Sequence, residues 1–418
     1  TFCKNQGDAN VAIGSYALDA VTTTSHNVGI GKFALSNITT GGESIAIGHN
    51  ALSTEANDVI GGVAIGFKAL EDQNVNNSHN VAVGHSAALN LTSGTDSVYM
   101  GYKAGGFGEI EGDNNVVVGT NAALKATDMS ESVFIGKDSG GNGVIEGASN
   151  ICVGVNSGYA LTSGASNVLV GKNTGQALLN GNHNVAIGHQ ALEVEDVSAG
   201  NVAIGYQALK VQNTDSSNNV AIGYQAGVAL NGSTDSVYIG HAVCGVGAVS
   251  GDSNVVIGKN AGLNMTSPDS NVIVGKSAVG AGVLTGNDNV VVGKDAGFEL
   301  TSGTGNTFIG KGAGDKTTTG KENVAIGLDA MGLGITTNPG GSGSDQFDGM
   351  YNVCVGNASG YDLTTGKQNV FIGQAAGANI NTGVSNVAIG AFAMDAANGG
   401  NDFCIAIGHN ALGADTQN

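Results

Sequence analysis

A five-residue phrase, Asn-Val-Ala-Ile-Gly, recurs from one end of this 418-residue chain to the other. It occurs unchanged at Asn10–Gly14, Asn184–Gly188 and Asn386–Gly390, and close variants bring the number of copies to 23. The final glycines of successive copies, such as Gly14 and Gly31, recur at an interval that varies by only one residue, with one exception. A short fixed period over a whole chain is typical of a solenoid, in which each coil packs only against its neighbours. The sequence therefore predicts an all-β parallel β-roll, or β-solenoid, of 23 coils.

The composition agrees with this architecture and argues against several kinds of partner. Glycine supplies 71 residues without the every-third-residue period of collagen, and there are only two prolines. The formal net charge is −19, and all 15 basic residues are lysine. Such a chain is not expected to displace counterions from nucleic acid, and its apolar runs are too short to span a bilayer. We therefore expect neither a nucleic-acid partner nor insertion into a membrane.

The five positions of the phrase form columns, which we number one to five. Columns two and four are almost always Val or Ile, and strand alternation places them on one face. Column three points to the other face and is never charged. A strand that is apolar on both faces is buried on both, and the rest of the repeat is too polar and too short to cover the second face. We therefore predict that other copies of the chain cover column three, with these residues at a trimer interface: Tyr99, Phe134, Leu169, Tyr238, Ile273, Phe308 and Phe371.

Column one is asparagine in 17 of the 23 copies. Asparagines stacked at the same corner of successive coils can bond to one another and to turn backbone groups. We predict such a ladder, and a line of ligand-binding amides is the functional alternative. The predicted ladder includes Asn10, Asn27, Asn115, Asn184, Asn201, Asn219, Asn254, Asn289, Asn323 and Asn386.

A second glycine recurs three residues before column one, for example at Gly94, Gly112 and Gly303. Glycine at a fixed offset predicts a tight turn with positive φ, and the phrase glycine predicts another turn. Two turns in each coil imply two short strands in each coil.

One interval between phrase glycines, from Gly327 to Gly356, is much longer than all the others. We therefore divide the chain into solenoid repeats at 1–331, a Gly/Ser-rich inserted loop at 332–351 and further repeats at 352–418. Within the loop, residues 340–348 fit the nonapeptide Gly-Gly-x-Gly-x-Asp-x-apolar-x, which binds calcium between stacked copies. Asp345 and Asp348 are the candidate calcium ligands. Because this nonapeptide occurs once, a plain loop is the simpler interpretation.

Seven lysines and five histidines directly follow a phrase glycine, among them Lys259 and His49. We interpret them as one exposed edge, with a pH-sensitive histidine row as the alternative. The five cysteines match no metal or haem spacing, and Cys152, Cys354 and Cys404 are expected to be buried small apolar side chains. The sequence shows no nucleophile elbow, phosphate loop or metal-ligand cluster, so we expect neither enzymatic activity nor a cofactor.

The segment 201–209 reads Asn-Val-Ala-Ile-Gly-Tyr-Gln-Ala-Leu, and 219–226 repeats its first eight positions with the same residues. This form resembles the head repeats of trimeric autotransporter adhesins, the YadA-like head, and more closely the arrays of bacteriophage tail-fibre proteins. The resemblance covers residues 10–412. It implies a left-handed parallel β-roll, a homotrimer and an adhesive or fibre role. Adhesin heads have shorter coils, and no coiled-coil stalk or anchor segment is evident here, which favours a fibre shaft.

We therefore expect a structural or adhesive fibre protein on the extracellular or virion surface. It would be the shaft of a phage tail fibre or a trimeric surface adhesin, with itself and a host-surface receptor as partners. One alternative is a subunit of an extracellular filament that polymerises end to end. A more distant alternative is an ice- or surface-binding solenoid, which needs a flat threonine column, whereas Thr22–Thr24 and Thr317–Thr319 are only local runs.

Overall fold

The structure is a computed structural model that describes residues 8–53, 60–73, 78–194, 197–213, 216–245, 248–332, 349–396 and 400–413. The chain divides into two compact units, Thr1–Lys210 (unit 1) and Val211–Asn418 (unit 2). In both units the regular secondary structure of the described residues is parallel β-strand without helix. The prediction of an all-β parallel solenoid is confirmed.

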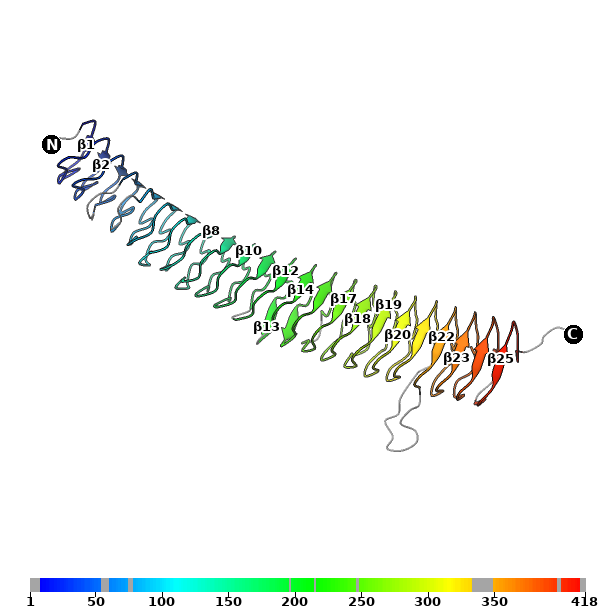
Figure 1. Ribbon diagram of the computed structural model, residues 1–418. Coiled ribbons are helices and arrows are strands. Elements are labelled where there is room, and N and C mark those ends of the chain that lie inside the picture. The colour runs from blue at the N-terminus through cyan, green and yellow to red at the C-terminus, as the bar shows by residue number, and fades with distance from the viewer. Residues whose placement is uncertain are drawn as a thin grey trace. The chain divides into compact units, whose positions relative to one another are not determined.

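Short strands recur once in each coil, and Figure 1 shows them following one another within each unit. The strands of unit 1 are β1 (Val11–Ile13), β2 (Val28–Ile30), β3 (Ile45–Ile47), β4 (Val63–Ile65), β5 (Val81–Val83), β6 (Val98–Met100), β7 (Val116–Val118), β8 (Val133–Ile135), β9 (Ile151–Val153), β10 (Val168–Val170), β11 (Val185–Ile187) and β12 (Val202–Ile204). Those of unit 2 are β13 (Val211–Asn213), β14 (Val220–Ile222), β15 (Ala229–Asn231), β16 (Val237–Ile239), β17 (Val255–Ile257), β18 (Val272–Val274), β19 (Val290–Val292), β20 (Thr307–Ile309), β21 (Val324–Ile326), β22 (Val353–Val355), β23 (Val370–Ile372), β24 (Val387–Ile389) and β25 (Ile405–Ile407). All except β13 and β15 consist of columns two to four of a phrase copy.

Neighbouring phrase strands within a unit pair in parallel, and the same columns face each other. Cys152 of β9 lies opposite Leu169 of β10, and Val324 of β21 lies opposite Val353 of β22. The long interval between β21 and β22 therefore leaves the strand register intact. Residues 333–348 of the predicted inserted loop, with Asp345 and Asp348, lie outside the described residues.

Column three lies inside the coil. In the phrase strands from β2 to β24 its side chains are buried within the single chain, because the rest of the same coil and its two neighbours enclose them. The prediction that column three forms a trimer interface is therefore wrong, since a side chain enclosed by its own chain cannot contact a second one. All seven residues predicted at the interface are fully buried in this way: Tyr99, Phe134, Leu169, Tyr238, Ile273, Phe308 and Phe371.

Two side chains whose sizes vary in opposite directions fill the interior across many coils. They are column three and the residue six positions later: Phe371 is followed by Gly377, and Ala64 by Leu70. A Cβ on Gly377 would lie 2.8 Å from the Phe371 ring, whereas the coil with Ala64 fully buries Leu70. The exchange keeps the enclosed volume nearly constant, as dense packing requires.

The described glycines three residues before column one do not adopt the predicted positive φ, except Gly349, whose φ is 67°. Gly94 and Gly112 do not adopt positive φ, which falls instead on the residue before column one, such as Asp96 at 53°. A Cβ on Gly94 would lie 2.6 Å from the carbonyl oxygen of Gly112 in the next coil. A Cβ on Gly112 would likewise clash with the carbonyl oxygen of Met129. Glycine is needed here because successive coils approach closely.

The second side of the coil, which is the stretch between two successive phrase strands, is less regular than predicted. Among the described residues, a second pair of strands occurs only at β13 and β15, and single bridges such as that between Leu91 and Ile110 join other coils. Leu91 lies seven residues after its phrase glycine, whereas Ile110 lies nine after its own. Because the coils differ in length on this side, a continuous ladder cannot keep its register.

Candidate functional site

Each unit exposes a face made of columns two and four of its phrase strands, which we call the valine–isoleucine face. Ile13 is 58% exposed and Ile135 38% exposed in unit 1, and Ile372 is 39% exposed in unit 2. Neither column is charged in any copy, although the chain carries 34 Asp and Glu. A continuous exposed apolar surface of this kind is typical of an interaction site.

The face keeps a constant geometry because the strands beneath it are in register. Each column repeats at the strand spacing of about 4.8 Å. Each strand ends at a phrase glycine with a positive φ, which is 142° at Gly48 and similar in the other copies. A Cβ on Gly48 would overlap the carbonyl group of Gly66 in the next coil, so this edge stays free of side chains. The result is a continuous strip bordered by column one on one side and by the residues just after the phrase glycine on the other.

The asparagine ladder forms the border along column one. Asn167 Oδ1 accepts from the backbone N of Asn184 at 3.0 Å and from its Nδ2 at 3.2 Å, and Asn167 Nδ2 donates to Gly181 O at 2.8 Å. Where column one is Ser97, its hydroxyl accepts from Asn115 N at 2.9 Å. The ladder therefore satisfies buried turn groups of the next coil. These ten predicted residues take part in such bonds between coils: Asn10, Asn27, Asn115, Asn184, Asn201, Asn219, Asn254, Asn289, Asn323 and Asn386.

A stack of rings forms the other border in the first coils of unit 1. We call it the aromatic row, and it consists of Tyr16, Phe33, His49, Phe67, His85 and Tyr102. Consecutive ring centroids lie 5.1, 6.2, 5.5, 4.8 and 5.3 Å apart. Lys32 and Lys103 place their Nζ atoms 4.8 and 5.1 Å from the centroids of Phe33 and Tyr102. The predicted corner histidines of these coils are thus members of a mixed ring stack, which extends the apolar strip at its edge.

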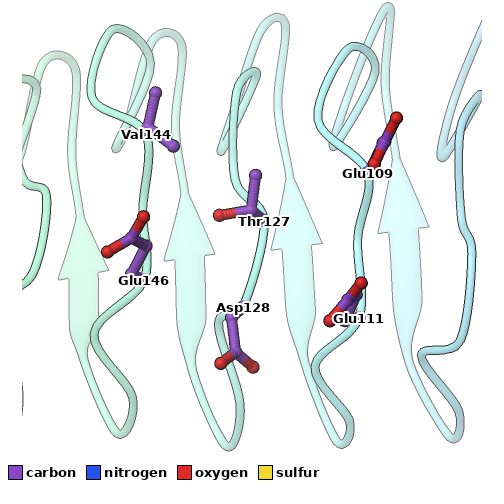
Figure 2. Close-up of a pocket in the computed structure, with 6 residues that line it drawn as sticks. All are labelled: Glu109, Glu111, Thr127, Asp128, Val144 and Glu146. Atoms are coloured by element: carbon purple, nitrogen blue, oxygen red, sulfur yellow. The ribbon is translucent and has the colours of Figure 1, made fainter.

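An acidic groove lies on the loop side of unit 1, in front of the strands in Figure 2. Its volume is about 390 Å³, and its lining comprises Glu109, Glu111, Thr127, Asp128, Val144 and Glu146. Glu111, Asp128 and Glu146 each lie four residues before column one of the following phrase, and Glu109 lies two residues before Glu111. Among the described residues, no group of three or more His, Cys, Asp or Glu side chains is arranged to hold a metal ion.

The described cysteines behave as structural side chains. Burial raises the pKa of the Cys152, Cys244 and Cys354 thiols well above the ordinary value of 9.0. A protonated thiol is a poor nucleophile, so these cysteines serve as small apolar side chains, as predicted for Cys152 and Cys354. Cys404 occupies column one and is partly exposed, contrary to the prediction that it is buried.

In the part of the chain that the structure describes, no helix has the length and apolar character needed to cross a membrane. A comparison with models of known protein families and with curated proteins finds no match to this chain. The resemblance to YadA-like heads and tail-fibre repeats therefore stays a prediction.

Proposed function

We propose that this chain is the shaft of an extracellular or virion-borne fibre, like that of a phage tail fibre or a trimeric surface adhesin. Its coils form a left-handed β-roll, and three copies associate through their valine–isoleucine faces. Its work is mechanical, because it carries an attachment function toward a receptor on a host surface. The proposal includes no catalytic activity and no cofactor.

The valine–isoleucine face is the observation that carries the proposal. The interior of each coil is already filled by column three and its partner, so the aliphatic residues of columns two and four are not needed there. Removing apolar surface from water contributes about 25 cal/mol per Å², and nearly every coil adds two partly exposed apolar side chains. A surface retained without charge in all copies of an acidic chain is therefore best explained by a covering partner.

A second copy of the chain is the partner that fits best. The covering surface must be flat, apolar and repeated at the strand spacing of about 4.8 Å, and the valine–isoleucine face itself has these properties. Three such faces can close around a three-fold axis, and the number three comes from the resemblance. The aromatic row would then lie at the rim of the contact in unit 1.

A charge placed on the face tests the proposal. Ile135→Asp should prevent assembly, because a buried unpaired carboxylate costs several kcal/mol in each copy. The single chain should stay folded at a cost of about 1 kcal/mol, since Ile135 is already partly exposed. Thr120→Asp is the matched control, because Thr120 is exposed and follows the phrase glycine after β7, outside columns two and four. Size-exclusion chromatography with light scattering gives the mass, and circular dichroism reports the fold.

The proposal fails if Ile135→Asp assembles like the control. Growth of the wild-type protein into particles of indefinite length would instead favour the end-to-end filament. In that case the interaction surface would lie at the ends of the coil stack and not on the valine–isoleucine face.

A further inference from the structure

Four consecutive coils of unit 2 carry a lysine directly after the phrase glycine. We call these residues the lysine row: Lys259, Lys276, Lys294 and Lys311. They follow strands β17 to β20, which pair in parallel and in register. The four side chains therefore leave the same corner of successive coils, with a spacing of about 4.8 Å from one coil to the next.

Backbone bonds on both sides fix this spacing. The carbonyl oxygen of Lys259 accepts from Ser277 N at 2.9 Å, and those of Lys276 and Lys294 accept from Asp295 N and Gly312 N at 3.0 Å. Directly before the lysines, the phrase glycines are so close that a Cβ on one would overlap the carbonyl of the next. The row cannot change its pitch without breaking the coil stack.

The charge of the lysine row is largely unbalanced by its surroundings. The four side chains lie at the surface, and Lys294 pairs with Asp295 at 3.4 Å. For the other three, the described residues provide no carboxylate within ion-pair distance. The carboxylate of Asp329 lies beside Gly312, the residue after Lys311.

Elsewhere the chain balances lysine across neighbouring coils. Lys210 pairs with Glu193, and Lys316 pairs with Glu299. The lysine row lacks such pairing between neighbouring coils. An acidic residue after the phrase glycine of every second coil would have provided it by alternating the charges. Four ammonium groups in line repel one another, and a chain with only 15 basic residues places four of them here. The arrangement suits a ligand that brings its own line of negative charges.

We propose that the lysine row binds a linear acidic polysaccharide laid along the coil axis. Charged groups repeat along such a polymer, as the lysines repeat from coil to coil at a fixed spacing. The residues that follow the four lysines are Asn260, Ser277, Asp295 and Gly312. Asn260 offers an amide and Ser277 a hydroxyl group to sugars, whereas the carboxylate of Asp295 is paired with Lys294 and Gly312 has no side chain. None of the four is a ring on which a nucleic-acid base could stack, and such stacking is a main source of affinity for single strands.

Fluorescence anisotropy with labelled dextran sulfate tests this inference on the full chain at low salt. Uncharged dextran and a thymidine oligonucleotide of similar length are the comparison probes. The row variant carries Lys→Gln at 259, 276, 294 and 311. The control variant carries Lys→Gln at 32, 125, 137 and 172, which are surface lysines of unit 1 outside any such row. Both variants lose four positive charges, so only the position of the change differs, and circular dichroism verifies their folds.

Wild-type protein should bind dextran sulfate and leave uncharged dextran unbound. The row variant should bind about tenfold or more weakly, with a shallower dependence on salt, because released counterions scale with the number of charge contacts. The control variant should stay within about twofold of wild type. Equal losses in the two variants, or no binding by wild type at low salt, would overturn the site. Tighter binding of the oligonucleotide through the same lysines would overturn the ligand class. None of these outcomes depends on the mass of the assembly, so the fibre proposal is tested separately.

Discussion

At the scale of single residues, two kinds of side-chain pairing hold the coil together. One is the bond from column one to the next coil, as between Asn167 and Asn184. The other is the shared interior volume of column three and the residue six positions later. The second pairing explains a puzzling feature of the sequence, which is that one column accepts glycine, alanine and phenylalanine in the same structural position.

A double substitution tests the shared volume. Phe371→Ala should cost about 3–5 kcal/mol of unfolding free energy by leaving a cavity. Gly377→Leu should also destabilise, because its Cβ alone would lie 2.8 Å from the Phe371 ring. Together they recreate the Ala64 and Leu70 combination, and Leu70 has a φ of 50°, close to the 60° of Gly377.

The double mutant should therefore regain much of the lost stability, with a coupling energy of about 2 kcal/mol or more in denaturant unfolding. Simple addition of the two single costs would show that these positions do not share one space. Phe371→Ala alone serves as the reference, since it reports the cavity without any new side chain.

The exchange of size was visible in the sequence and would have placed column three correctly. Strand alternation assigns columns two and four to one face and column three to the other, but it does not tell which face is inside. Pairs such as Phe308 with Gly314, or Ala186 with Leu192, identify column three as the inner face. A large residue at one position is matched by a small residue at the other, which indicates that the two side chains fill the same interior space. The asparagine column was predictable for a similar reason, since one residue type at one corner of each coil points to bonds along the stack.

At the scale of the element, the unit of structure is one coil, which runs from one column-one residue to the next, as from Asn167 to Asn184. The phrase strand and its register could be predicted, because a strict repeat leaves only one way to stack equal coils. The second side could not, because its residues vary in number and the predicted second strand forms only at β13 and β15 among the described residues. The acidic groove was not predicted on the same side, although Glu111, Asp128 and Glu146 share one position, four residues before column one, because most other coils carry no carboxylate there.

Removing one coil from unit 1 tests this equivalence. Deleting Val168–Asn184 joins Asn167 to Val185 and leaves every phrase intact, so the protein should fold with a slightly smaller denaturant m-value. Deleting Val168–Val185 instead leaves the phrase one residue short. Ile187 then moves from column four into column three, and the strand residues turn to the wrong faces.

Circular dichroism and urea unfolding distinguish the two deletions. The first should keep the wild-type spectrum and a single transition, and the second should lose both stability and cooperativity. Comparable damage in the two would mean that coils are not interchangeable units, which would remove the basis for a shaft made of repeats.

At the scale of the whole molecule, the chain separates an acidic surface from an uncharged one. A net charge of −19 keeps copies soluble and limits random association, whereas the valine–isoleucine face carries no charge at all. The lysine row of unit 2 stands beside that face as a local exception. In the proposed fibre shaft, this division would assign self-association, solubility and ligand binding to different parts of the coils.

Sedimentation equilibrium of the wild-type protein at several loading concentrations tests the central claim most directly. If three valine–isoleucine faces cover one another, the mass should equal three times the chain mass of 41.2 kDa and should not change on dilution. The interface of Ile135 and its equivalents would then be dry, and Ile135→Asp should sediment as one chain. A wild-type mass of a single chain at every concentration would contradict the account, because the exposed face would then have no partner of its own kind.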